Sequence, residues 1–163
     1  MIAQSVGAVL VATWVHDYAP AIRGLVLASP AFKVKLYVPL ARPALALWHR
    51  LRGLFFINSY VKGRYLTHDR QRVASFNNDP LITRAIAVNI LLDLYKTSER
   101  IVSDAAAITL PTQLLISGDD YVVHRQPQID FYQRLRSPLK ELHLLPGFYH
   151  DTLGEENRAL AFE

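Results

Sequence analysis

The chain has 163 residues, of which 51% are hydrophobic and 20% are charged, and its formal net charge is +4. The length is close to the roughly 150 residues of a typical single domain, and the composition excludes a disordered chain. Because the sequence contains no cysteine, disulfides, thiolate nucleophiles and Cys-ligated zinc are excluded. No apolar run reaches the roughly 18 residues that a membrane-spanning helix requires, and the apolar N-terminal stretch lacks the basic start of a signal peptide.

The positive charge is concentrated in residues 33–72, where nine Lys and Arg side chains and a single acid, Asp69, give a charge of +8. Aromatic residues are interleaved with these charges, which is compatible with nucleic-acid binding, contact with an anionic membrane, or a solvated face over a core. The sequence has no aromatic RNP strand, zinc finger or GXXG loop, and we therefore expect no nucleic-acid partner. We expect a cytoplasmic protein, with peripheral contact to an anionic membrane as an open alternative. The oligomeric state is left open.

The first elements in chain order predict part of a layered core. Small and apolar residues over 6–18 predict a buried helix that ends before Pro20. The short apolar run Ile22–Ser29 predicts a strand that is buried on both faces. Residues 33–100 contain no convincing strand, and several Pro and Gly residues divide them into short helical pieces, the clearest of which is a helix over 83–95.

Strand signals return in the last third of the chain. A helix over 98–107 precedes a strand over Thr112–Ser117, a helix over Pro127–Leu135, a strand over Leu139–Leu145 and a helix over 155–163. Strands that alternate with helices predict an α/β fold, in which a parallel sheet carries helices on its faces. Ligands of such sheets bind beyond the carboxyl ends of the strands, so three loops are the places where a site is expected.

The first loop carries Ser5, in the pentapeptide Ala3-Gln4-Ser5-Val6-Gly7 directly before the first predicted helix. A serine on a sharp strand-to-helix turn needs small residues two positions away on either side, because a larger Cβ would collide across the turn. Ala3 and Gly7 occupy these positions, and the pattern is a nucleophile elbow with Ala in the first Gly position. A simple N-cap of the helix is the alternative role for this serine.

The other two loops carry an acid and a histidine. Asp119 and Asp120 follow the predicted strand Thr112–Ser117, where an acid can reach across the top of the sheet or merely form a turn. His150 follows the next strand, and among the six histidines it is the one in a loop beyond the carboxyl end of a strand. The order Ser, Asp, His on successive strand-end loops is the chain order of α/β-hydrolase triads.

From Ser5 to about Asp151 the chain resembles the carboxyl-terminal part of an α/β-hydrolase. It is most similar to the monoacylglycerol lipase and lysophospholipase group, also called serine aminopeptidase S33 or hydrolase 4. The resemblance rests on the elbow AQSVGA, the strand end LVLASPAF, and the segments LPTQLLISGDDYVV and LPGFYHDTLGE. The chain is also similar to the hydrolase part of bacterial proteins that fuse such a domain to a methyltransferase. The resemblance implies a serine hydrolase of carboxylic esters, with monoacylglycerol-like or lysophospholipid-like lipids as substrates.

By this resemblance Ser5 is the nucleophile, His150 is the base, and Asp120 rather than Asp119 is the acid that orients the base. The backbone N–H of Val6 would donate to the oxyanion at the positive end of the first helix. The reaction would pass through an acyl-enzyme that water hydrolyses, and it requires no metal and no organic cofactor.

The resemblance also divides the chain into three parts. Residues 1–32 and 101–163 would form the hydrolase core, and residues 33–100, the predicted cap segment, would form a helical lid over an acyl-binding pocket. Four aromatic residues are candidates to line this pocket, with packing in the core of the cap as the alternative: Phe32, Trp48, Phe55 and Phe56.

An α/β-hydrolase has several strands before its elbow, whereas four residues precede Ser5 here. We expect the strand that feeds the elbow and the loop that donates a second oxyanion N–H to be absent, and Ile22–Ser29 to lack its neighbouring strands. Loss of one oxyanion donor lowers turnover by about 10²–10³-fold. We therefore expect a hydrolase fragment with little or no activity alone. The alternatives are a non-catalytic fragment that binds a lipid surface or a partner through its basic cap, and an amide or peptide hydrolase of the same fold.

Overall fold

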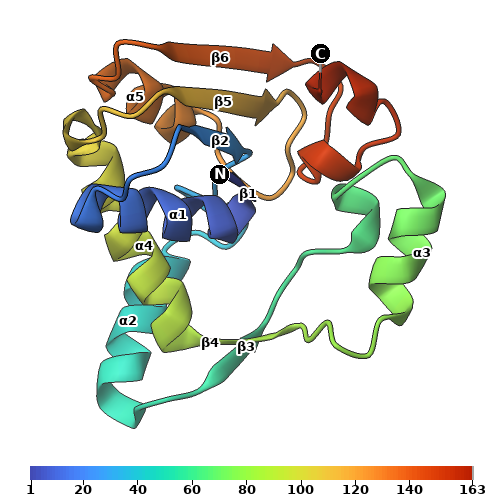
Figure 1. Cartoon of the computed structure of the whole chain (residues 1–163). Helices are drawn as coiled ribbons and strands as arrows, with labels where there is room; N and C mark the ends of the chain where they lie inside the picture. The colour runs from blue at the N-terminus through green and yellow to red at the C-terminus, as the bar shows by residue number, and fades with distance from the viewer. Residues whose placement is uncertain (163) are drawn as a thin grey trace.

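The structure, a computed structural model that describes residues 1–162, contains a four-stranded parallel sheet with the strand order β1-β2-β5-β6 (Figure 1). The strands are β1 (Ile2–Gln4), β2 (Leu25–Ala28), β5 (Thr112–Ser117) and β6 (Lys140–Leu145). Because the strands are parallel, their carboxyl ends lie along one edge of the sheet, and the loops that follow them meet there. The predicted α/β fold is confirmed, as are the three predicted strands, of which β2 is shorter than predicted.

One face of the sheet is covered by α1 (Ser5–Tyr18), α4 (Val88–Ser103) and α5 (Gln126–Arg134), with α4 in contact with both other helices. Successive side chains of a strand point to opposite faces, so alternate residues of β2 and β5 face these helices. Each large side chain that is fully buried in this layer contributes about 1.5–3 kcal/mol. The layer holds α1 against the sheet and thereby fixes the start of this helix. Its fully buried members include Ala8, Val9, Leu27, Leu114, Ile116 and Phe131.

The opposite face of the sheet carries a smaller core and two 3₁₀ turns, η3 (Thr152–Gly154) and η4 (Arg158–Ala161). Leu115, Leu145 and Phe148 are buried in this core. The turns lie beside the carboxyl ends of β5 and β6 in Figure 1. They therefore place the chain that follows β6 next to the edge where a site is expected.

The predicted helix over 155–163 is wrong for the described residues 155–162, in which a short 3₁₀ turn, η4 (Arg158–Ala161), is found in place of an α-helix. Glu155 has extended backbone angles, φ −67° and ψ 159°, and its buried side chain accepts hydrogen bonds from distant backbone groups. These contacts hold residue 155 outside a helix.

The predicted cap segment extends away from the sheet (Figure 1) and contains the elements α2 (Ala41–Arg52), β3 (Phe56–Asn58), η1 (Gly63–Tyr65), α3 (Arg70–Asn78) and β4 (Ala85–Ala87). β3 and β4 pair in antiparallel register, with Ile57 opposite Ile86. The prediction that this segment has no strand is therefore wrong. Each of these strands has three residues, which is too short for an alternating pattern to be read from the sequence.

The helices predicted over 83–95 and 98–107 are one continuous helix, α4, followed by the 3₁₀ turn η2 (Ala105–Ala107). Residues 85–87 belong to β4, so the helix begins later than predicted. The predicted boundary of the cap segment at residue 100 lies inside α4, and this helix packs against α1 and α5 of the core layer as well as against α2. One helix thus joins the core to the predicted cap segment.

The expectation that the strand feeding the elbow is absent is also wrong. Ile2–Gln4 form β1, which pairs with β2, and the N–H of Val26 donates to the carbonyl of Met1 at 2.8 Å. β2 lies between β1 and β5 rather than without neighbours. Three residues suffice for a strand here because β2 offers a free row of hydrogen-bonding groups beside them. Among residues 1–162, no helix has the length and apolar character needed to cross a membrane.

Candidate active site

Ser5 stands at the turn between β1 and α1 and has a left-handed backbone conformation, with φ 55°. This conformation is uncommon for a residue that carries a Cβ, and it costs of the order of 1–3 kcal/mol where the surrounding fold imposes it. The adjacent strand and helix hold Ser5 in place. The serine does not act as an N-cap: Gln4 is the capping residue of α1, and the hydroxyl of Ser5 has a different partner. The expected collision of a larger side chain at position 7 is not found. A Cβ added to Gly7 would have no neighbour within 4 Å beyond the helix itself.

The partner of Ser5 is His150, whose Nε2 lies 2.7 Å from Oγ of Ser5. On the other side of the imidazole ring, Nδ1 lies 2.8 Å from Oδ2 of Asp120. A ring proton on Nδ1 donates to the carboxylate and leaves Nε2 free to accept the proton of the serine hydroxyl. His150 is 5% exposed and Asp120 is 8% exposed, so water competes little for these hydrogen bonds. The structure therefore brings together the three side chains that the sequence placed in separate loops.

The carboxylate of Asp120 is held by the loop that follows β5. Its Oδ1 accepts hydrogen bonds from the backbone N–H of Val122 at 2.7 Å and of Val123 at 3.0 Å. Oδ2 remains for the imidazole of His150. Asp119, the neighbouring acid, is exposed, and its backbone N–H donates to the carbonyl of Phe148. The geometry distinguishes the two acids, because Asp120 alone of the pair has its carboxylate on the histidine.

Val6 follows Ser5 in the first turn of α1. The first four N–H groups of an α-helix have no partner within the helix, and they carry its partial positive charge. The N–H of Val6 is one of these groups, so it is a donor directly beside the Ser5 hydroxyl. Such a donor can stabilise negative charge that develops on an atom bound to Ser5.

An apolar cavity of about 540 Å³ has Ser5 and His150 in its wall. It adjoins a second cavity of about 440 Å³, which in turn adjoins a third of about 710 Å³ with Trp48 and Phe55 in its wall. Ser59, the residue after β3, lines all three cavities. The shared wall residues arrange the three mainly apolar cavities in a row from Ser5 into the predicted cap segment, and this row of cavities is called the path below.

The four aromatic candidates occupy different places. Trp48 and Phe55 line the outermost cavity. Phe32 is 2% exposed and packs in the main core, where its ring lies 4.7 Å from that of Phe131. Phe56 is 62% exposed and is not in the wall of any of the three cavities. Phe55 lines a cavity and its neighbour Phe56 does not, because successive residues along an extended strand point in opposite directions.

Gln4 was not predicted as a site residue, although it precedes Ser5. Its Nε2 donates to Oδ1 of Asp151 at 2.9 Å, and its Oε1 accepts the backbone N–H of Leu153 at 3.2 Å. The side chain before the serine therefore binds the loop that carries His150. No sequence signal identifies this role, since the contact joins residues almost 150 positions apart.

The sequence matches the family model described as serine aminopeptidase S33 over residues 1–157. The chain is 97% identical over 163 residues to uncharacterized protein YnbC of Escherichia coli (strain K12), of which it covers 28%. It is 25% identical, over its full length, to phospholipase YtpA of Bacillus subtilis (strain 168), of which it covers 64%. The chain thus spans less than two-thirds of the length of either relative.

Two solved structures have the same fold over nearly the whole chain. The monoacylglycerol lipase of Paleococcus ferrophilus matches 99% of this chain and 63% of its own, with a TM-score of 0.89 and 19% identity. A soluble variant of the monoglyceride lipase of Saccharomyces cerevisiae, in complex with a substrate analogue, matches 99% of this chain and 57% of its own, with a TM-score of 0.85 and 16% identity. At these identities the likeness shows the α/β-hydrolase fold.

Proposed function

We propose that this chain, which belongs to the serine aminopeptidase S33 family, hydrolyses carboxylic esters through a triad of Ser5, His150 and Asp120. The family and its relatives support a hydrolase of the lipase and esterase type. The observation that carries the finer assignment is the hydrogen-bonded chain from Asp120 through His150 to Ser5. The left-handed conformation of Ser5 adds support, because backbone strain of this kind clusters at functional sites.

The mechanism follows from the positions of the protons. Oγ of Ser5 attacks the ester carbonyl while Nε2 of His150 takes the hydroxyl proton. Asp120 holds the Nδ1 proton and stabilises the imidazolium that forms. The N–H of Val6 donates to the carbonyl oxygen as it becomes negative. His150 then protonates the departing alcohol, activates a water molecule against the acyl-enzyme, and returns the proton to Ser5 as the carboxylic acid leaves.

The path of three cavities supports an ester with a long apolar acyl chain. Its walls are mainly aliphatic and aromatic, and its inner end contains the Ser5 hydroxyl. Burial of each methylene contributes about 0.8 kcal/mol, so the path favours long chains over short ones. We therefore propose monoacylglycerol-like or lysophospholipid-like substrates, with the acyl chain in this path.

Hydrolysis that depends on Ser5 tests the proposed activity. We expect the purified chain to hydrolyse a short-chain aryl ester, a monoacylglycerol and a lysophosphatidylcholine above the rate of the Ser5→Ala variant. Equal rates for wild type and Ser5→Ala, with both folded by circular dichroism, overturn the proposal. A faster reaction with the matching acyl arylamide would favour amide hydrolysis.

A second proposal concerns contact between the chain and a membrane surface that contains its substrate. α2 has no buried residue, and it exposes Leu47, Trp48 and Leu51 beside Arg50 and Arg52. Residues 33–68 contain no acid. An amphipathic helix with arginines beside exposed apolar side chains favours an anionic bilayer surface, and this helix also borders the outermost cavity. We propose that α2 makes peripheral contact with such a surface.

Vesicle flotation tests this contact. We expect the chain to float with vesicles that contain anionic phosphatidylglycerol and to stay behind with vesicles of pure phosphatidylcholine. The double variant Arg50→Gln, Arg52→Gln should lose most of the difference, while Arg70→Gln on α3 should keep it. Equal recovery with both kinds of vesicle would contradict the proposal.

A further inference from the structure

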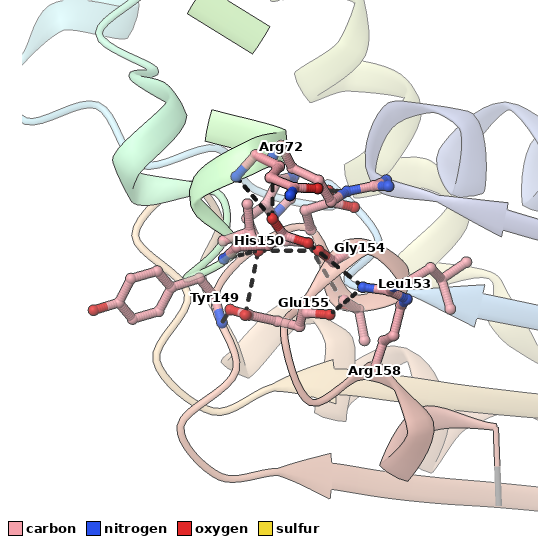
Figure 2. Close-up of polar contacts among 12 residues, drawn as sticks. Arg72, Tyr149, His150, Leu153, Gly154, Glu155 and Arg158 are labelled. Carbon is pink, nitrogen blue, oxygen red and sulfur yellow. Dashed lines mark hydrogen bonds and ion pairs between the residues drawn. The ribbon is translucent and has the colours of Figure 1, made fainter. Parts of the chain in front are cut away.

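The loop that carries His150 contacts the predicted cap segment, and the buried carboxylate of Glu155 makes several of these contacts (Figure 2). Two others are at Asp151, whose backbone N–H donates to the carbonyl of Leu66 at 2.7 Å and whose carboxylate pairs with Arg72 at 3.1 Å. Glu155 is 2% exposed. Its Oε1 accepts the backbone N–H of Tyr149 at 2.9 Å and lies 3.0 Å from Nδ1 of His68. Its Oε2 accepts the backbone N–H groups of His68 at 3.1 Å and Glu156 at 2.9 Å, and the hydroxyl of Thr67 at 3.3 Å. Three backbone N–H groups and two side chains thus surround this carboxylate.

These donors come from two distant parts of the chain. Tyr149 directly precedes His150, in the loop that follows β6. Thr67 and His68 lie between η1 and α3, in the predicted cap segment. Because Glu155 follows His150 by five residues, its carboxylate returns to the backbone beside His150 and joins it to the cap segment. The triad itself does not use this carboxylate.

The charge of Glu155 is retained in spite of burial. Burial raises the pKa of the carboxyl group. Hydrogen bonds lower this pKa by a larger amount, and they come from the backbone N–H groups of Tyr149, His68 and Glu156 and from the side chain of His68. The net result is a pKa below the ordinary value. An ionised carboxylate makes charge-assisted hydrogen bonds, which are about twice as strong as neutral ones. The hydrogen bonds that connect the loop and the cap segment through Glu155 are therefore stronger than those that a neutral side chain would make.

Aromatic contacts follow the same route. The imidazole of His68 lies 3.8 Å from the ring of Tyr149, centroid to centroid. The ring of Tyr149 meets the ring of Tyr121 edge-on at 5.0 Å, and Tyr121 directly follows Asp120. The cap segment thus touches the neighbours of both the base and the acid of the proposed triad.

From these contacts we propose that Glu155 is a positioning residue, which holds the backbone beside His150 so that Nε2 stays within hydrogen-bonding distance of Ser5, and which makes this geometry depend on the cap segment through His68. The inference rests on the proposed function of the triad. Displacement of a reacting group by about 1 Å lowers the rate by about 10²-fold. A loosened loop is therefore expected to lower turnover while leaving the acyl-binding path unchanged.

Glu155→Gln is the primary test. Both carboxylate oxygens of Glu155 have donors beside them. In either orientation of the glutamine amide, its NH₂ group therefore faces donors and cannot accept their hydrogen bonds. We expect kcat for the short-chain ester to fall roughly 10–100-fold, with KM within about twofold of wild type. Glu156→Gln, an exposed neighbour, should keep the wild-type kcat. The low-field resonance of the His150 Nδ1 proton should weaken in Glu155→Gln, and the amide of Tyr149 should exchange faster.

A matched pair at His68 separates the hydrogen bond from ring stacking. Asparagine places an amide nitrogen near the position of Nδ1, whereas leucine has no donor, and neither has an aromatic ring. We expect His68→Asn to keep most of the wild-type kcat and His68→Leu to lose more of it. If Glu155→Gln does not fold, this pair still tests whether the contact between Glu155 and His68 affects kcat. The side chain of His68 is 44% exposed, so we expect its replacement to be tolerated.

The outcomes distinguish this inference from the proposed function. If wild-type hydrolysis does not depend on Ser5, the proposed function fails, and the His150 resonance and Tyr149 exchange still decide whether Glu155 positions the loop. A folded Glu155→Gln variant with wild-type kcat, resonance and exchange overturns the inference. Equal kcat values in His68→Asn and His68→Leu overturn the dependence on the cap segment through the side chain of His68.

Discussion

Replacement of Asp120 by asparagine tests the proposed acid with almost no change in shape. Oδ1 of Asp120 accepts two backbone N–H groups, those of Val122 and Val123. In Asp120→Asn these groups require the amide oxygen, so the NH₂ group is turned toward Nδ1 of His150. A donor in this place forces Nδ1 to accept, and the ring proton moves to Nε2. Nε2 can then no longer accept the proton of Ser5.

The size of the effect follows from this change of tautomer. A histidine base in the wrong tautomer lowers kcat by about 10⁴-fold, which corresponds to roughly 5–6 kcal/mol in the barrier. Because both backbone hydrogen bonds survive, we expect the variant to unfold within a few degrees of wild type. The assay is short-chain ester hydrolysis together with the labelling rate of Ser5 by a fluorophosphonate probe. Asp119→Asn is the matched control and should equal wild type. An Asp120→Asn rate within tenfold of wild type would refute the reasoning.

Three further predictions concern the acyl path, the loop after His150 and the response to pH. Ser59 lines all three cavities, so Ser59→Trp should lower kcat/KM for a long-chain ester at least about tenfold relative to a short-chain ester; an unchanged ratio argues against this path. The hydroxyl of the fully buried Thr152 lies 2.8 Å from that of Ser29 and 2.9 Å from that of Ser117. Urea denaturation of Thr152→Val should therefore show a loss of about 1–3 kcal/mol in the free energy of unfolding, and a loss below about 0.5 kcal/mol would contradict it. The lowered pKa of Glu155 stabilises the fold fully above the ordinary value of 4.5, and this contribution is lost as the pH falls through the lowered value. The difference in unfolding free energy between wild type and Glu155→Gln should accordingly shrink as the pH falls below the ordinary pKa of 4.5, whereas a constant difference would show that this carboxyl group does not titrate differently in the folded state.

The residues of the candidate site could be located from the sequence because parallel strands place their loops at one edge. Ser5, Asp120 and His150 each follow a strand of the same sheet, so recognising β5 and β6 was enough to predict that their loops meet. The helix α1 was equally readable, because its small and apolar residues form a pattern of sufficient length. These predictions depend on local sequence and one general rule of topology.

Other features depend on partners that local sequence does not reveal. β1 forms because β2 is beside it, and β3 forms because β4 returns to it from almost 30 residues away. Three residues carry no readable period in either case. The hydrogen bonds of Gln4 and Glu155 join segments far apart in the chain, and both residues are ordinary polar types whose burial only the fold determines.

The loop after His150 is held by contacts from three parts of the structure, so a substitution that removes one set of contacts leaves the others in place. Gln4 binds Asp151 from the elbow strand, Thr152 binds serine hydroxyls within the sheet, and Glu155 binds the cap segment. The first two anchors do not involve the cap segment. Removal of the Glu155 contacts should therefore loosen the loop without detaching it from the sheet. The change in kcat of Glu155→Gln should exceed what its loss of stability alone would cause, because a small displacement lowers the rate of proton transfer between His150 and Ser5 more than it weakens packing.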